Sequence, residues 1–328
     1  MRFSVVLVLM LAACGPEPAR ESVRWQPIEL RLTAADNHPW WSFPVRSTWT
    51  HEQSGRTLEI DAVWDGGRAW LIRFAAPEAG TWRYETSSDD AGLDGLSGLV
   101  EAAEPGAEAV ETNPNLRGQV RASADGRHFE YADGTPFLLL ADTLWAGNTA
   151  RAGLGSNEGG PFFEYLDDRQ DNGFTAVLMQ TVHGFGDYPE DPAGHANEGG
   201  HLFVGRDFEQ LNPDYLEYAD RRWEVLFERG LAVASPFLWW GKTESCVFEP
   251  EQAQKLAGYL AARYGAFNVI WAVSGNSCMS SKYNLPPMAE MRCGNTQGSS
   301  PCALHAAFKA AKAMSSRWTP SLPRSPVP

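Results

Sequence analysis

The chain has 328 residues, of which 43% are hydrophobic, and this content is sufficient for two domains with buried cores. Its 27 Lys and Arg residues are outnumbered by 41 Asp and Glu residues, which gives a formal net charge of −14. Because nucleic acids are bound by basic surfaces, we expect no nucleic-acid partner. Aromatic residues make up 12% of the chain and include 13 Trp, a content that suits both sugar-stacking surfaces and ordinary cores.

The N-terminus has the pattern of an export signal. Arg2 supplies a short positive region, and Phe3–Leu11 is an apolar run too short to span a bilayer. The run ends in Leu-Ala-Ala-Cys, which matches a bacterial lipobox, although an unlipidated signal peptide with a chance cysteine is the alternative. We expect a signal peptide over residues 1–14, lipidation of Cys14 and a flexible tether over residues 15–24. Because Gly and not Asp follows the cysteine, we expect a lipid anchor in the outer membrane, with the protein periplasmic or at the cell surface.

The remaining cysteines indicate disulfides more than metal ligation. In an exported protein four cysteines permit two disulfides with three alternative pairings. No two of them form Cys-x-x-Cys, and the histidines of one long loop match no compact ligand motif. We therefore expect neither a metal site nor a cofactor. The cysteines are Cys246, Cys278, Cys293 and Cys302, and the histidines are His183, His195 and His201.

Residues 25–102 predict an all-β domain. Polar and apolar residues alternate with period two in Ile28–Leu32, Leu58–Val63 and Trp70–Phe74. Gly-rich stretches such as Asp65-Gly66-Gly67 supply the turns, and no helical period occurs. The spacing predicts an antiparallel β-sandwich of Ig-like size. Its tryptophans could contact sugars, but packing in the sandwich core is the favoured interpretation for most of them: Trp40, Trp41, Trp64, Trp70 and Trp82.

A linker over residues 103–116 leads to a second domain over residues 117–314, followed by a Pro-rich tail over residues 315–328. The second domain opens with a predicted hairpin around Asp125-Gly126. Apolar runs of strand length then alternate with helical patterns, which predicts a partial α/β barrel of the TIM type with about four βα units. A doubly wound sheet is the alternative, but no G-x-G-x-x-G follows any strand. The strands are Phe137–Ala141, Phe174–Met179, Leu231–Phe237 and Val269–Val273, and the helices are Pro161–Asn172, Asp214–Arg229 and Glu251–Tyr264.

Polar and aromatic residues follow each of these strands. In an α/β barrel the C-terminal ends of the strands surround the active site, so these residues are expected to share one site. A single such residue is more often structural, but the pattern recurs at every strand end. The expected substrate-binding residues are Asp142, Trp145, Gln180, His183, Trp239 and Trp240, and Asn276 follows the last strand.

Several separate motifs resemble the apiosidase-like glycoside hydrolase family. They are Arg127-His128-Phe129, Asp133–Phe137, Ala141–Trp145, Asn172-Gly173-Phe174 and Asn268–Trp271. The segments around Trp64, Trp70 and Trp82 also resemble the N-terminal sandwich that precedes barrel domains in bacterial polysaccharide-degrading proteins. The resemblance implies a (β/α)8 barrel, a pair of catalytic carboxylates and a polysaccharide or oligosaccharide ligand.

The chain departs from the family pattern in two places. Where the resemblance implies an acid/base carboxylic acid after the fourth strand, this chain has Asn276, which cannot donate a proton at neutral pH. The implied nucleophile belongs to a later strand, and residues 315–328 contain four prolines and no strand pattern. We therefore expect a C-terminally truncated barrel, from a damaged gene or completed in a homodimer.

Three functions remain open on the sequence. The first is a hydrolase of plant-type polysaccharide side chains, weak or inactive in this form. The second is a lipid-anchored carbohydrate-binding protein without catalysis, and the third is a fragment without function. Asn276 is not an acid. Whether the chain is an enzyme therefore depends on whether other side chains supply the carboxyl groups of the reaction.

Overall fold

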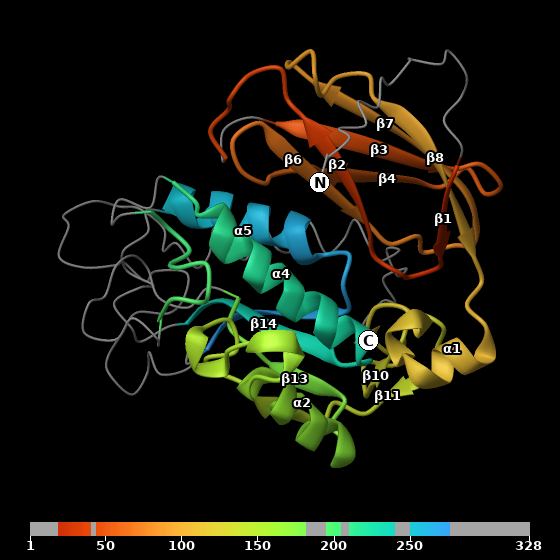
Figure 1. Cartoon of the computed structure of the whole chain (residues 1–328). Helices are drawn as coiled ribbons and strands as arrows, with labels where there is room; N and C mark the ends of the chain where they lie inside the picture. Colours follow the sequence, from red (N-terminus) through yellow and green to blue (C-terminus); the bar gives the residue numbers. More distant parts are fainter. Residues whose placement is uncertain (1–18, 41–43, 182–194, 205–209, 240–249, 276–328) are drawn as a thin grey trace, which may run out of the picture.

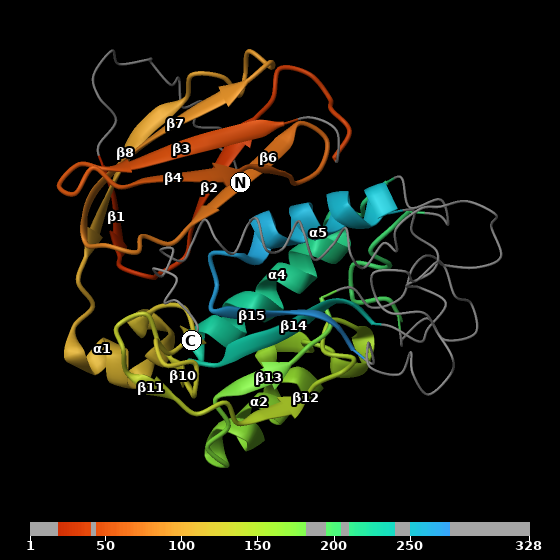
Figure 2. The same cartoon turned by 180° about the vertical axis from the view of Figure 1, so that it is seen from behind.

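The computed structural model describes residues 19–40, 44–181, 195–204, 210–239 and 250–275, and for 237–239, 250–253 and 273–275 it describes the backbone only. A β-sandwich lies against two helices, and these helices cover one face of a parallel sheet (Figures 1 and 2). The two helices are α4 (Pro213–Glu228) and α5 (Pro250–Tyr264). No helix in the described ranges is long and apolar enough to cross a membrane.

The sandwich consists of a five-stranded sheet in the order β1-β8-β7-β3-β4 and a three-stranded sheet in the order β2-β6-β5. The predicted alternating segments form strands: β2 and β6 pair antiparallel, with Leu30 opposite Ile72. An all-β N-terminal region is therefore present as expected. Its strands are β1 (Arg20–Val23), β2 (Ile28–Thr33), β3 (Val45–His51), β4 (Thr57–Asp61), β5 (Val63–Trp64), β6 (Ala69–Phe74), β7 (Gly80–Ser88) and β8 (Ser97–Ala103).

Tryptophans fill the core of this region. Trp49 stacks on Phe74 with ring centroids 3.8 Å apart, and Trp82 meets Phe74 in an edge-to-face arrangement with ring centroids 5.3 Å apart. The described tryptophans that the sequence left between sugar contact and core are all 9% exposed or less. Packing in the interior is thus confirmed for Trp40, Trp64, Trp70 and Trp82, whereas Trp41 lies outside the described residues.

The first strand differs from the sequence prediction. Residues 20–23, which were expected in the tether, form β1, and β1 pairs with β8 in parallel. The expectation of a purely antiparallel sandwich is therefore wrong at this edge. After β1 the chain turns at Trp25, whose φ is +66°, and crosses to the other sheet as β2. β1 and β8 are far apart in the sequence and are not joined by a hairpin, so they can pair in parallel.

The connection between the two regions is ordered by side-chain hydrogen bonds. It contains α1 (Ala107–Thr112) and a 3-10 turn at Pro114–Arg117, which the absence of an apolar period did not predict. Asn115 is buried, and its Nδ2 donates to the carbonyls of Phe227 at 3.1 Å and Leu231 at 3.3 Å. Its Oδ1 accepts from Nδ2 of Asn268 at 2.9 Å. The connection is therefore fixed to the N-terminal ends of the parallel strands.

The predicted hairpin is present, with a third strand added. Its sheet has the order β11-β10-β9 and closes the N-terminal end of the parallel sheet, where Tyr131 and Phe137 pack against Ala176 and Ala232. Phe137 of β11 belongs to this small cluster, whereas Phe129 of β10 is exposed. Their bounds are β9 (Arg121–Ala122), β10 (Phe129–Glu130) and β11 (Pro136–Phe137).

The second sheet has four parallel strands in the order β12-β13-β14-β15. Helices connect successive strands, as the alternation of strand and helix patterns predicts, and they cover the face that carries Val177, Val233 and Val269. In both views α2 lies on the side away from the sandwich (Figures 1 and 2). The bounds are β12 (Ala141–Thr143), α2 (Pro161–Asp171), β13 (Ala176–Leu178), β14 (Ala232–Trp239) and β15 (Val269–Gly275).

The first strand of this sheet begins later than predicted. The apolar run Phe137–Ala141 was expected to be one buried strand, but Phe137 belongs to β11 and only Ala141 belongs to β12. The intervening residues Leu138–Leu140 are exposed. The prediction is wrong because this run joins two sheets: the Leu140 carbonyl accepts from the N–H groups of residues 175 and 176, so pairing with β13 starts only there.

Candidate functional site

The described strands bring the expected site residues to one edge. Because β12, β13, β14 and β15 run parallel, their C-terminal ends at Thr143, Leu178, Trp239 and Gly275 lie together. We call this the strand-end edge. In α/β folds, loops at this edge are free to carry functional groups because the opposite edge is occupied by the connections into the strands.

A buried asparagine connects the first two strand ends. Asn148 follows β12, is 0% exposed, and donates from Nδ2 to the carbonyls of Gln180 at 3.1 Å and Thr181 at 3.2 Å. Those two residues follow β13. The neighbouring Gly147 permits this approach, because a Cβ there would lie 2.7 Å from Sδ of Met179. The amide therefore fixes the loop after β12 onto the loop after β13.

Two hydroxyl groups extend this connection to the third strand. The Thr181 hydroxyl hydrogen-bonds to the Ser235 hydroxyl of β14, and both residues are buried. Oγ of Ser235 also donates to the Met179 carbonyl at 2.9 Å. The ends of β12, β13 and β14 are thus held by a continuous series of neutral hydrogen bonds, which we call the strand-end cluster: Asn148, Gln180, Thr181 and Ser235.

Three expected binding residues lie at this edge. Trp145 is half-buried in the loop after β12, and Gln180 is 6% exposed directly after β13. Trp239 ends β14 and pairs with Gly275 of β15. These backbone positions are adjacent, as the sequence pattern predicts, and the roles of the side chains in binding stay predictions.

Asp142 is held by a helix on the outer face of the sheet. It stands in register with Val177 and Val233, which pack against the helices, and Nη1 of Arg169 on α2 donates to its Oδ2 at 2.6 Å. Partial desolvation raises the pKa of Asp142, but hydrogen bonds from the Thr143 N–H and from Arg169 outweigh it and keep the pKa below its ordinary value. Asp142 is therefore ionised at neutral pH and bound to α2.

Glu198 is a further acid, bonded to the loop after β12. Both carboxylate oxygens accept from Nη2 of Arg222, at 3.0 and 2.9 Å, and Oε1 also accepts from the Leu154 N–H at 2.7 Å. Arg222 is 0% exposed, so the pair is shielded from solvent on the side of the arginine. Charge-assisted hydrogen bonds of this kind fix a loop in position, which is a structural role.

The remaining expected residues lie outside the described part of the chain. They are Cys14, His183, Trp240 and Asn276, together with the four further cysteines and several loop acids. Within the described ranges, no group of three or more His, Cys, Asp or Glu side chains could hold a metal ion.

Sequence reasoning missed the residues that organise the strand-end edge. Asn148 and Ser235 belong to no recognisable motif. Arg222 is one of several polar residues of α4, and the helical pattern does not show that it is buried. A glycine directly before an asparagine was the one available signal, since Gly147 permits a close approach to Met179. The hydrogen-bond partners are distant in sequence, so no spacing rule could identify them.

The comparison with family models decides the relationship. The model for the apiosidase-like catalytic domain matches residues 123–322, which is more than half of the chain. The chain belongs to the apiosidase-like glycoside hydrolase family. A second model, for a domain of unknown function named DUF5060, matches residues 21–89 of the sandwich. No curated protein matches the sequence.

Solved structures agree with this family at the level of the fold. A protein from Bacteroides vulgatus that is described as a glycoside hydrolase aligns with a TM-score of 0.68 at 17% identity, over 90% of this chain. This chain spans 54% of that protein, or about half its length. A glycoside hydrolase family 5 protein from the same organism aligns with a TM-score of 0.44 at 19% identity, over 62% of this chain and 38% of its own, and supports no inference.

Proposed function

We propose that this apiosidase-like chain binds side chains of plant-type polysaccharides at the strand-end edge and hydrolyses them weakly or not at all. The position of the four strand ends supports this proposal most. The family match over residues 123–322 includes all four parallel strands, and their C-terminal ends meet where Trp145 and Gln180 lie. Trp145 is partly exposed at this edge, and an aromatic side chain suits a sugar, which offers an apolar ring face.

We further propose that residues 117–314 form part of a TIM-type barrel. Four parallel strands connected by helices agree with the first half of such a barrel. The N-terminal region would then be the Ig-like sandwich of polysaccharide-degrading proteins. For the whole protein we propose attachment to the outer membrane through a lipid at Cys14, facing the periplasm or the cell surface, which rests on the lipobox pattern alone.

We propose weak activity because the chain has an asparagine where a carboxylic acid is expected to donate the proton. Retaining hydrolysis requires one carboxylic acid that donates a proton to the leaving group and one carboxylate that attacks the sugar. Asn276 occupies the position that the family resemblance assigns to the acid. Asp142 is unsuited to replace it, because its lowered pKa leaves no proton to donate at neutral pH. Glu198 is bound to Arg222.

A carbohydrate-binding protein without catalysis is the second candidate. The same observation at position 276 supports it, because a site can keep its sugar contacts after the acid is lost. The two candidates share the ligand and differ in turnover. Restoring the acid therefore separates them.

The test measures turnover and binding in the full chain. We would assay wild-type protein and the Asn276→Asp variant with 4-nitrophenyl apioside, and measure binding of pectin oligosaccharides by isothermal titration calorimetry. With one of the chain's carboxylates as the nucleophile, hydrolysis is expected to rise roughly 100-fold or more in the variant, because general acid catalysis contributes about 10²–10⁴-fold. Asn172→Asp is the matched control, since it adds the same charge at an exposed residue after α2.

The outcomes distinguish the candidates. Binding without turnover in both proteins supports the carbohydrate-binding protein. Binding together with increased turnover in Asn276→Asp, and not in Asn172→Asp, supports a degenerate hydrolase. Absence of both binding and turnover in all three proteins contradicts the proposed ligand class.

A further inference from the structure

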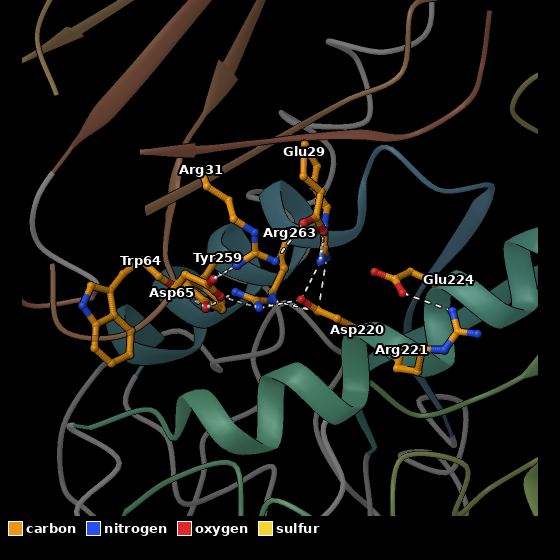
Figure 3. A network of polar contacts seen from close by, with 10 residues as sticks. Glu29, Arg31, Trp64, Asp65, Asp220, Arg221, Glu224, Tyr259 and Arg263 are labelled. Atoms are coloured by element: carbon orange, nitrogen blue, oxygen red, sulfur yellow. Dashed lines mark hydrogen bonds and ion pairs between the residues drawn. The ribbon is translucent and has the colours of Figure 1, made fainter. Parts of the chain in front are cut away.

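The junction between the sandwich and the helices contains a buried series of charged groups. Asp220 of α4 accepts from Nη1 of Arg73 on β6 at 3.2 Å and from Nε of Arg263 on α5 at 2.9 Å (Figure 3). Both arginines are 1% exposed, and Asp220 is 8% exposed. On the outer sides, Glu29 pairs with Arg73 and Asp65 pairs with Arg263, each at 2.7 Å. We call these five residues the junction cluster.

The junction cluster satisfies its own polar groups. Nη1 of Arg73 also donates to the Arg263 carbonyl at 2.9 Å, and the Tyr259 hydroxyl donates to the Trp64 carbonyl at 2.7 Å (Figure 3). A cavity of about 200 Å³ adjoins the cluster, but its lining charges are engaged, with Arg73 bound to Asp220 and Glu224 bound to Arg221. The contacts at the junction are those of a fixed interface.

Aromatic contacts continue the junction towards the strand-end edge. Trp40 of the sandwich is 9% exposed and meets Tyr259 of α5 edge-to-face at a centroid distance of 5.4 Å. On its other side it meets Phe203, 2% exposed, at 6.2 Å. The sandwich also contacts the first turn of α4, because a Cβ on Gly66 would lie 2.9 Å from Cγ of Pro213. Trp40 therefore joins the sandwich to a segment that belongs to the second region.

That segment, residues 195–204, lies along the N-terminal half of α4. Nδ2 of Asn197 donates to the Tyr215 carbonyl at 2.8 Å. Nδ2 of Asn212, the N-cap of α4, donates to the carbonyls of Gly199 and His201, each at 2.9 Å. The segment is therefore hydrogen-bonded to the start of the helix at three points.

The same segment supports the loop after β12. The Ala150 N–H donates to the Ala196 carbonyl at 2.7 Å. Arg222 of α4 donates to the Ala152 carbonyl at 2.9 Å and to Glu198, which itself accepts from the Leu154 N–H. Residue 150 is two positions beyond Asn148, which fixes Gln180 and Thr181. An uninterrupted set of contacts thus runs from the sandwich to the strand-end edge.

We propose that the sandwich is a positioning element for the strand-end edge and that Trp40 is the residue through which it acts. The buried state of Trp40, Trp64, Trp70 and Trp82 supports this role over sugar contact, because a stacking platform must be exposed. Rigid side-chain contacts with two alternative arrangements can carry coupling between distant sites, and the coupling must be measured. The proposed role of the sandwich is to hold the strand-end edge in position, and this role does not depend on whether the chain hydrolyses sugars.

The experiment is amide hydrogen exchange on the full chain with Trp40→Ala. Trp25→Ala is the matched control, because Trp25 is 7% exposed and contacts Gly118 in the connection, away from segment 195–204. Because Trp40 contacts Phe203 of segment 195–204, and this segment is bonded to Ala150, exchange in segment 195–204 and in residues 149–154 is expected to accelerate at least about tenfold. Trp25→Ala is expected to leave both segments within about twofold of wild type.

Two results would overturn the proposal. One is acceleration confined to the sandwich and α5 in Trp40→Ala. The other is equal acceleration of residues 149–154 in both variants, which would indicate general destabilisation. If Trp40→Ala does not fold, Trp40→Phe retains a smaller ring and is expected to give the same pattern with about threefold acceleration. Equal acceleration of exchange in all segments of Trp40→Phe would likewise contradict the proposal.

Discussion

The junction cluster and the strand-end cluster both bury polar groups between elements distant in sequence, but they differ in charge. At the junction, two arginines share Asp220, and each has a second carboxylate partner. At the strand ends, the Asn148 amide and the Ser235 hydroxyl donate to main-chain carbonyls, and the Thr181 hydroxyl hydrogen-bonds to Ser235, all without any formal charge. A buried charge that loses its partner is far more costly than a neutral group that loses one hydrogen bond.

This difference suggests separate tasks for the two clusters. The charged cluster fixes the sandwich and helices in one arrangement, since few other geometries satisfy five ionic groups at once. The neutral cluster holds the loops after β12 and β13, where we propose that the ligand binds. Three predictions test this division, from the largest expected effect to the smallest.

Asp220→Asn is expected to have the largest effect. The substitution keeps the shape of the side chain but leaves Arg73 and Arg263 buried beside an uncharged group, which is expected to lower the free energy of unfolding by about 3–5 kcal/mol. Urea denaturation followed by circular dichroism measures this loss. Glu52→Gln is the control, because Glu52 pairs with Arg83 on the exposed surface and its loss is expected to cost less than about 1 kcal/mol. Equal losses in the two variants would contradict the ranking.

The same carboxylate predicts a dependence on pH. Burial alone raises the pKa of Asp220, but Arg263 and Arg73 outweigh burial and lower it from 3.8 to about 2. Since the folded state holds the ionised form, this stabilisation is complete above about pH 4 and is lost as the pH falls through about 2. The stability difference between wild type and Asp220→Asn is therefore expected to shrink by about 2 kcal/mol across this range. A difference that stays constant with pH would show that the charge of Asp220 is not responsible.

Asn148→Ala is expected to have the smallest effect on stability, about 1–2 kcal/mol, because two carbonyls each lose one neutral hydrogen bond. Asn115→Ala is the matched control: it is also buried and also donates to two carbonyls, but at the N-terminal ends of the strands. We expect a larger stability loss by denaturation in Asn115→Ala, because Nδ2 of Asn268 also loses its acceptor, and weaker binding of pectin oligosaccharides in Asn148→Ala alone. Equal binding in both variants would remove the strand-end cluster from the proposed site.

The sequence by itself determined the elements that have strong local patterns. Period-two alternation gave β2 and β6, helical periodicity gave α2, α4 and α5, and unbroken apolar runs gave β13, β14 and β15. These patterns are legible because each element buries one face or both, which fixes the spacing of its apolar residues. The parallel order of the strands follows from the same alternation, and it predicted which edge would gather Trp145 and Gln180.

Only the tertiary structure decided which polar residues hold the molecule together. The run Phe137–Ala141 looked like one strand because hydrophobicity does not reveal where a chain leaves one sheet for another. Asp142 was expected at the site from its place after a strand, and only the structure shows that Arg169 of α2 donates to it. Asp220, Arg222 and Asn148 have no local signature, because their partners lie on other elements far along the chain. Such hydrogen bonds depend on packing between elements, which a one-dimensional pattern does not contain.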